Sequence, residues 1–257
     1  MEVRPPQMVL YMYNGRMRRE PYGVGSIIHV VKRGARGLPY LKEKSDYDRM
    51  LLMLAHFNDV SLRPLWLRDL IAEEKLRTFE RASSWAEKDP LTRIHAFCLH
   101  ANHLHFLLEE TIEGGVSRFM QKIGNGLSGH LNEKYAEYGT PFQGPYKSKT
   151  IDSDAYLRYV FAYIQIKNAF EQFPGGYAMA EKNFDKAYEW CLNFPYGSLY
   201  DHVWRSDLHM PRREIVSSDL FSSLWTLKEF KDFSKDVIEG RAHLGTDDKN
   251  AFRGAFL

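Results

Sequence analysis

The chain has 257 residues, 44% of them hydrophobic, and a formal net charge of +2, which is typical of a soluble globular protein with one large domain or one domain with appendages. Its two cysteines, Cys98 and Cys191, have no framework spacing, which excludes a structural zinc site built on thiolates and suits a reducing cytosol. The apolar run Met8–Tyr13 is too short to span a bilayer, and no small-residue cleavage site follows it. We therefore expect a cytoplasmic protein that makes no membrane contact.

Positive charge gathers in the first part of the chain, where few acidic residues oppose it. The cluster consists of Arg16, Arg18, Arg19, Lys32, Arg33, Arg36, Lys42 and Lys44. Such clustering suits a surface that contacts phosphates, and it equally suits an ordinary solvated basic surface.

The first half of the chain predicts strands and helices in alternation. Glycine-bounded β-branched residues predict strands, and apolar residues at helical spacing predict helices. In chain order we expect a strand over 25–34, a helix from Ser45 or Asp46, a charged helix over 63–89 ended by Pro90, and a hairpin with strands from Ile94 to Leu99 and from about His103 to Leu108.

The second half predicts more helix. The expected elements are a glycine-containing helix over 114–139, a loop and short strand in "TPFQGPYKSKTI", a well-capped helix over 152–173, a helix in "AEKNFDKAYEWCLNF", and an amphipathic helix region over 217–240. This order predicts an α+β fold with an antiparallel sheet. We expect one domain over 1–177, with a helical insertion at about 60–90, and a helical C-terminal extension over 178–257.

The hairpin carries a His-x-His pair, His103 and His105. Alternate residues of a strand point to the same face, so the two imidazoles lie side by side and are available to a divalent metal. Taken alone, the pair fits core or surface histidines at least as well. The helix over 152–173 carries Tyr156, Tyr159 and Tyr163 on one face. A stripe of this kind is commonly buried packing, but a tyrosine facing a metal can also be a nucleophile toward a phosphodiester.

Several blocks together resemble the HUH single-tyrosine transposases of the insertion-sequence-200-like group, and most closely the REP-associated tyrosine transposases. In order along the chain these are "GSIIHVVKRGARGLPYL", "DYDRMLLML", "HAFCLHANHLHFLLE" and "SRFMQKIGNGLSGHLNEKYAEYGTPFQGPYKSKTIDSDAYLRYVFAYI". The resemblance extends from about residue 19 to residue 176, and the order of the blocks makes it more specific than any single motif.

The resemblance implies a ferredoxin-like antiparallel sheet with helices packed on it. It implies a transposase that nicks and rejoins single-stranded DNA beside hairpins through a 5′-phosphotyrosine, as a monomer or homodimer. Tyr163 matches the nucleophile, His103 and His105 match the metal ligands for Mg²⁺ or Mn²⁺, and Asn102 fits the hairpin turn. The candidate DNA contacts are Arg33, Arg36, Arg118, Lys122, Lys147, Lys149 and Lys167, with stacking from Phe142 or Tyr146.

One position departs from the family. Four residues after the nucleophile the family usually places Gln or Asn as a third metal ligand, whereas this chain has Lys167, which has no lone pair when protonated. Asn168, another side chain, water, or the lysine charge itself could fill this role, although an α-helix carries Asn168 away from the nucleophile's face. The charged 63–89 stretch also exceeds the family connection and is either a DNA-contacting or a packing element.

Three functions stay open at this point. The first is an active or domesticated strand transferase, favoured by His103, His105 and Tyr163. The second is a catalytically impaired protein of the same fold that binds hairpin nucleic acid, favoured by Lys167. The third is a metal-dependent hydrolase unrelated to nucleic acid, which needs further ligands that the sequence pattern does not supply; His29 and His95 are expected to be structural.

Overall fold

The computed structural model describes residues 22–61, 64–204, 212 and 214–242, and the backbone of two short paired strands, β1 (Met12–Tyr13) and β2 (Arg16–Met17). The side chains of the basic residues Arg16, Arg18 and Arg19 lie outside the described residues, as do those of the Met8–Tyr13 run. The contribution of these N-terminal residues to a basic surface stays a prediction.

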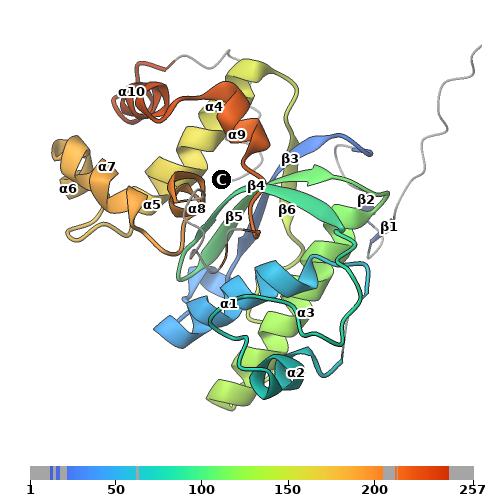
Figure 1. The fold of residues 1–257 in the computed structure, drawn as a ribbon. Helices are drawn as coiled ribbons and strands as arrows, with labels where there is room; N and C mark the ends of the chain where they lie inside the picture. The colour runs from blue at the N-terminus through green and yellow to red at the C-terminus, as the bar shows by residue number, and fades with distance from the viewer. Residues whose placement is uncertain are drawn as a thin grey trace, which may run out of the picture.

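A four-stranded antiparallel sheet forms the centre of the molecule (Figure 1). Its strands are β3 (Ile27–Arg33), β4 (Thr92–Leu99), β5 (His103–Glu110) and β6 (Lys147–Thr150), in the order β4-β5-β3-β6. One long helix connects β3 to β4 and another connects β5 to β6, which gives the β-α-β-β-α-β connectivity of the ferredoxin-like fold. The expected α+β class and the expected hairpin are confirmed.

The two faces of the sheet differ because residues alternate along each strand. On β5, Leu104 and Phe106 belong to the core on one face, whereas His103 and His105 belong to the other face. The histidine face of β5 continues onto β3, where Arg33 is paired with His103.

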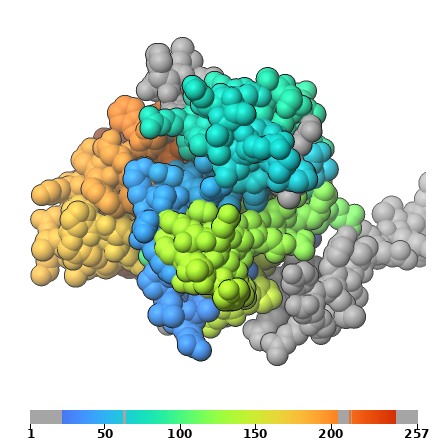
Figure 2. All heavy atoms as spheres, turned by 90° about the horizontal axis from the view of Figure 1, so that it is seen from below, coloured from blue at the N-terminus to red at the C-terminus, as the bar shows by residue number. Residues whose placement is uncertain are grey.

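Helices α1 (Lys44–Phe57) and α3 (Gly115–Tyr135) cover the first face. The glycines inside α3 weakened its prediction, and the structure gives one of them a packing reason. A Cβ at Gly126 would overlap the ring of Phe57, so the absence of a side chain lets α1 and α3 approach closely. In Figure 2, seen from below, α3 in yellow-green lies in front of α1 in blue.

The expected long helix over 63–89 is wrong. Only α2 (Trp66–Ala72) is helical, and the chain then turns through positive φ angles at Glu74 and Phe79. The indole N–H of Trp85 donates to Asp69 at 3.0 Å, which folds the second part of the segment back onto α2. Tertiary contacts therefore override helix propensity here. The segment packs beside α1, as Figure 2 shows in teal, and acts at least as a packing element.

The second face, which carries the histidines, is covered by the helices that follow β6 (Figure 1). These are α4 (Asp154–Ala162), a π-helical turn η2 (Tyr163–Lys167), α5 (Asn168–Phe170), α6 (Tyr177–Lys182), α7 (Phe184–Leu192), α8 (Leu199–Val203), α9 (Asp219–Leu224) and α10 (Leu227–Ile238). The helix expected over 217–240 is two helices, because Thr226 forms a capping box with Glu229 at the start of α10.

The C-terminal part of the chain also covers the open edge of β4. Leu99 N–H donates to Tyr196 O at 2.9 Å, Ser198 N–H to Phe97 O at 2.9 Å, and Ser217 N–H to Ile94 O at 2.8 Å. Unpaired strand edges invite aggregation, and these bonds satisfy one. The hydrophobic core between the histidine face of the sheet and the helices that cover it contains residues from both sides of position 177. The division into domains at that point therefore stays a prediction.

Two smaller observations concern membrane-spanning helices and the cysteines. Within the described ranges, no helix is both long enough and apolar enough to cross a membrane. Cys98 and Cys191 are free, buried thiols.

Candidate functional site

The predicted histidine pair lies on the second face of the sheet, at the end where β4 turns into β5. The rings of His103 and His105 are 5.0 Å apart between centroids and nearly perpendicular. His105 is 3% exposed, whereas His103, at the start of the strand, is partly exposed. The structure therefore brings the pair together at a surface edge, as the alternation of the strand predicts.

Asn102 in the hairpin turn fixes the orientation of His103. Its Nδ2 donates to Gly37 O at 2.9 Å, which leaves its Oδ1 to accept from His103 Nδ1 at 2.7 Å. A neutral imidazole that carries its proton on Nδ1 has a free lone pair on Nε2. The turn therefore presents His103 in the form that ligates a metal through Nε2.

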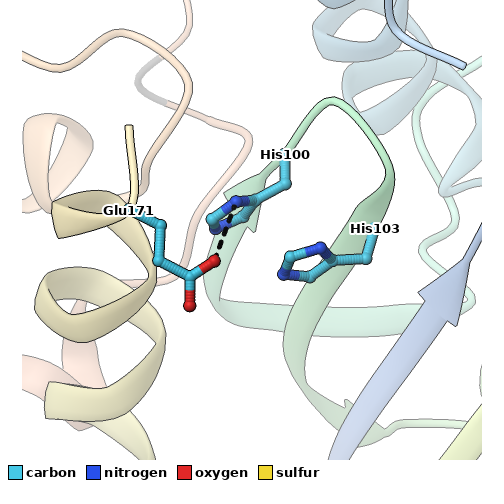
Figure 3. Close-up of side chains that lie close together, drawn as sticks. All are labelled: His100, His103 and Glu171. Atoms are coloured by element: carbon cyan, nitrogen blue, oxygen red, sulfur yellow. Dashed lines mark ion pairs between the residues drawn. The ribbon is translucent and has the colours of Figure 1, made fainter. Parts of the chain in front are cut away.

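Two residues that the sequence argument did not select complete a cluster with His103 (Figure 3). His100 stacks on His103 with 4.0 Å between ring centroids, and its Nδ1 is 3.7 Å from Oε2 of Glu171. Ligand atoms of His100, His103 and Glu171 all lie within 4.8 Å of one another. Figure 3 shows Glu171 reaching from the tyrosine-bearing helix toward the two rings on the hairpin.

Burial keeps these imidazoles neutral. It lowers the pKa of His100 to about 3 and, together with the charge of Arg33, that of His103 to about 4. Burial also lowers the pKa of His105 well below its usual value. At neutral pH all three rings therefore keep the lone pair that a metal requires.

Tyr163 faces the histidines from the same chain. Its ring is 5.5 Å from that of His105 and 6.0 Å from that of His29, both in edge-to-face arrangements. Of the other two tyrosines of the stripe, Tyr156 is fully buried, and Tyr159 lies partly buried with its ring 6.3 Å from that of Tyr163. Tyr163 is thus in ring contact with two histidines of this face.

The electrostatic environment of Tyr163 favours the protonated phenol. Burial, and then the negative charge of Glu171, raise the pKa of Tyr163 well above its usual value, while Arg33 opposes them. The ammonium of Lys167 lies 5.4 Å from the centre of the tyrosine ring. The lysine that replaces the expected ligand is therefore close to the proposed nucleophile.

The helix is irregular at this point. Tyr163–Lys167 form a π turn, in which the N–H of Asn168 donates to the carbonyl of Tyr163. A π turn brings residue i+5 closer to the face of residue i than an α-helix does, so the sequence-based objection to Asn168 does not hold. Asn168 is 1% exposed, and neither of its amide atoms has a hydrogen-bond partner among the described residues. π turns frequently mark functional sites.

The predicted DNA-contacting cations fall into two groups. Arg33, Lys147 and Lys149 lie on the histidine face, since the last two pair with Val31 and His29 of β3. Arg36 follows β3 in a short turn with a positive φ of 57°, and its side chain is exposed.

The other group lies elsewhere. Arg118 and Lys122 are on α3, which covers the opposite face, and the Lys122 ammonium donates to the backbone carbonyls of Asp59 and Val60. The structure therefore does not bring these two cations to the histidine site.

The two aromatic residues considered for base stacking have structural contacts instead. Phe142 is 5% exposed, with its ring 5.2 Å from that of Tyr40. The hydroxyl of Tyr146 is 2.8 Å from that of Tyr22 and 3.1 Å from that of Ser117, on the α3 side of the sheet. Phe142 is thus buried in this structure, whereas Tyr146 is partly exposed and its stacking stays a prediction.

Sequence reasoning missed His29, His100 and Glu171. His100 had a usable signal, since it stands three residues before His103 across a tight turn. Glu171 lies eight residues after Tyr163, and only the π turn and the packing of the helix on the hairpin decide which way it faces. His29 is distant in sequence and meets His105 through strand pairing.

The fold and the site together define a class of protein. Imidazoles on one face of a ferredoxin-like sheet meet a tyrosine and a carboxylate from the helix that covers this face. Residues 68–167 match the model of a family described as IS200-like transposases. This match agrees with the resemblance of the sequence blocks: the stretch that it covers is similar to IS200-like transposases.

Comparisons with individual proteins add little. One similar solved structure is that of a REP-associated tyrosine transposase bound to a REP hairpin. It has 13% sequence identity and a TM-score of 0.42, and the alignment covers 73% of this chain and 84% of that chain. This likeness is too distant to transfer a property. No curated protein matches the chain.

Proposed function

We propose that this protein is a transposase that cleaves and rejoins single-stranded DNA beside a hairpin, with Tyr163 as the nucleophile and a 5′-phosphotyrosine as the intermediate. The observation that carries the proposal is the position of the Tyr163 ring, 5.5 Å from the ring of His105 on the face that also presents His103. Hairpin recognition follows from the resemblance of the sequence blocks.

The residues around His103 fit a divalent cation. His100, His103 and Glu171 form a mixed nitrogen and oxygen donor set. The ring of His105 lies beside this set, with its centroid 5.0 Å from that of His103. Such a set suits Mn²⁺ better than Mg²⁺, which prefers oxygen ligands alone. We assign His103 and His105 as ligands, as the resemblance implies, and Glu171 as the oxygen ligand in place of the residue replaced by Lys167. When bound, the metal supplies Lewis-acid polarisation of the phosphate.

The chain's own groups perform the transesterification. The phenolic oxygen of Tyr163 attacks phosphorus, the bond from phosphorus to the 3′ oxygen breaks, and the leaving oxygen takes up a proton as a 3′-hydroxyl. The phenol loses its proton in this step and the leaving 3′ oxygen gains one, so the step is balanced in protons. A later attack by a 3′-hydroxyl on the phosphotyrosine restores the DNA strand and releases the tyrosine.

The cations on the histidine face suit the scissile strand. Arg33 is paired with His103, and its charge lowers the pKa values of both His103 and Tyr163. We propose that Arg33, together with Lys147, Lys149 and Lys167, contacts the phosphates of the strand to be cut. Arg36, Arg118 and Lys122 lie outside this group of four cations, so any contact of theirs with DNA is separate from the contacts that we propose for the scissile strand.

The arrangement also supports a monomer. Tyr163, His103 and Glu171 come together within one chain, so the site needs no tyrosine helix from a second copy. We therefore propose that a single chain suffices for cleavage.

The deciding experiment is an adduct assay. The protein is incubated with hairpin-bearing single strands and Mn²⁺, and a covalent protein–DNA species is sought on a denaturing gel. We expect the adduct with wild type and its loss in Tyr163→Phe, while DNA binding is retained. Tyr159→Phe is the matched control, since it removes a neighbouring phenol from the same helix, and it should still form the adduct. An adduct that survives Tyr163→Phe would contradict the assignment.

One observation favours a second candidate function. Lys167 occupies the family's usual ligand position and lies beside the Tyr163 ring. If wild type binds the hairpin strands but forms no adduct with any divalent metal, the protein is a hairpin-binding module with its chemistry lost. A hydrolase unrelated to nucleic acid is disfavoured by the family match, although His100 and Glu171 supply the extra ligands that the sequence pattern lacked.

A further inference from the structure

His29 and His105 form a buried hydrogen bond between two strands. Nε2 of His29 is 3.0 Å from Nδ1 of His105, and the two side chains are 0% and 3% exposed. Val31, the partner of His105 in the strand register, is two residues after His29, so the two histidines are diagonal neighbours on one face. Long side chains can span such a diagonal, and these two meet ring to ring at 5.3 Å.

The chemistry of two neutral imidazoles allows two arrangements of this bond. A hydrogen bond between two neutral imidazoles joins an N–H of one ring to a lone pair of the other. In one arrangement His105 Nδ1–H donates to His29 Nε2, and Nε2 of His105 keeps a lone pair. In the other, His29 Nε2–H donates, and the proton of His105 sits on Nε2, where it blocks ligation.

We infer that His29 is a positioning residue that accepts the hydrogen bond from His105 Nδ1–H and so holds the His105 Nε2 lone pair ready for the metal. This rests on the proposed function, in which His105 is a metal ligand. An outer partner of this kind fixes the tautomer and the orientation of a ligating imidazole. Asn102 does the same for His103 through its Oδ1, so both predicted ligands have a dedicated hydrogen-bond acceptor.

The two hydrogen-bonded histidines also contact the proposed nucleophile, Tyr163. The ring of Tyr163 packs edge-to-face against both His29 and His105. His29 thus contacts a proposed ligand and the proposed nucleophile at once, from the strand opposite the tyrosine helix.

The direct test is NMR of the metal-free full chain labelled with ¹⁵N at histidine. Long-range correlations between the ring ¹⁵N nuclei and the protons on the ring carbons distinguish a protonated from an unprotonated ring nitrogen. We expect Nδ1 of His105 to be protonated and Nε2 to be unprotonated. The opposite tautomer, with the proton on Nε2, would overturn the inference without affecting the rest of the proposed function.

Metal titration of variants gives the second readout. His29→Phe removes the acceptor, and we expect it to weaken Mn²⁺ binding by roughly 10- to 100-fold. His29→Gln keeps an acceptor oxygen and should stay closer to wild type than His29→Phe does. The matched control is His56→Phe, since His56 is a buried histidine that packs near Trp66 and Trp85 on the other side of the sheet. It should leave Mn²⁺ affinity unchanged.

The outcomes separate the inference from the function beneath it. Equal Mn²⁺ affinity in His29→Phe and wild type, while His105→Ala loses affinity, overturns the positioning role alone. Unchanged affinity in His105→Ala overturns the ligand assignment itself and the inference with it. If His29→Phe does not fold, the tautomer measured in wild type still decides the inference.

Discussion

Glu171 is the residue whose role the structure changes most. The family's usual third ligand position holds Lys167, whereas the Glu171 carboxylate lies among His100 and His103. The side chain is 46% exposed, so its removal should not disturb the core. Glu171, one helical turn after Lys167, can therefore take the place of the third ligand in the proposed metal site.

We expect Glu171→Ala to weaken Mn²⁺ binding at least ~10-fold, because it removes the one negatively charged donor of the cluster. Isothermal titration with Mn²⁺ measures this directly. Glu189→Ala, at an exposed position on α7, is the control and should bind Mn²⁺ as wild type does. If the two variants bind equally well, Glu171 is not a ligand.

At the scale of elements, Asp46 joins the start of α1 to the end of α3. Its carboxylate accepts from the N–H groups of Lys42 and Glu43 at 2.9 and 3.0 Å, from Lys134 Nζ at 2.7 Å and from Tyr135 Oη at 2.6 Å. Burial opposes the charge, but these hydrogen bonds outweigh it and lower the pKa of Asp46 from 3.8 to about 2. The ionised form of Asp46 is therefore more stable in the folded chain than in the unfolded chain.

A carboxyl group whose pKa is lower in the folded chain than in the unfolded chain stabilises the protein at pH values above the unfolded pKa. This stabilisation is lost as the pH falls through the folded pKa. Asp46 should thus contribute about 2 kcal/mol to the free energy of unfolding at pH 7, and this contribution should disappear between about pH 4 and pH 2. Asp46→Asn should remove both the contribution and this part of the pH dependence, as measured by urea denaturation at several pH values.

The control for this prediction lies on the same helix. Asp48 is half-exposed and pairs with Lys44 on the surface, so Asp48→Asn should change the free energy of unfolding by no more than about 0.5 kcal/mol. A loss of stability in Asp46→Asn that does not vary between pH 2 and pH 7 would argue against the linkage.

At the scale of the whole molecule, a buried ion pair joins two parts of the C-terminal segment beside the edge of β4. Arg212 and Asp201 are 5% and 3% exposed, with Arg212 Nε 2.9 Å from Asp201 Oδ1. The same guanidinium donates to the carbonyl of Pro195, close to the residues that pair with the edge of β4. The extension is therefore part of the molecule's core packing.

Arg212→Ala should lower the free energy of unfolding by roughly 3 to 5 kcal/mol, because it leaves the Asp201 carboxylate buried without a partner. Arg241→Ala, which breaks an exposed pair with Asp236, is the control and should have little effect. The double variant Asp201→Leu with Arg212→Met should recover most of the lost stability. Chemical denaturation of the three proteins checks these expectations, and equal stability of Arg212→Ala and wild type would contradict them.

The sequence by itself determined the features that depend on neighbours along the chain. Strand alternation placed His103 and His105 on one face, helical spacing and caps located the tyrosine helix, and the order of the blocks pointed to the family whose model matches residues 68–167. The long helix predicted over 63–89 failed because propensity is weak against the contacts of Trp85 and Asp69. The helix region expected over 217–240 contains two helices, which meet at the Thr226 cap.

Only the tertiary structure decided which distant residues meet at the site. His29, His100 and Glu171 come from a strand, a turn and a helix end, and two packed cores on opposite faces of the sheet bring them together. The π turn after Tyr163 sets which later residues of the helix face the sheet. Such meetings depend on packing between elements, and local periodicity holds no information about that packing.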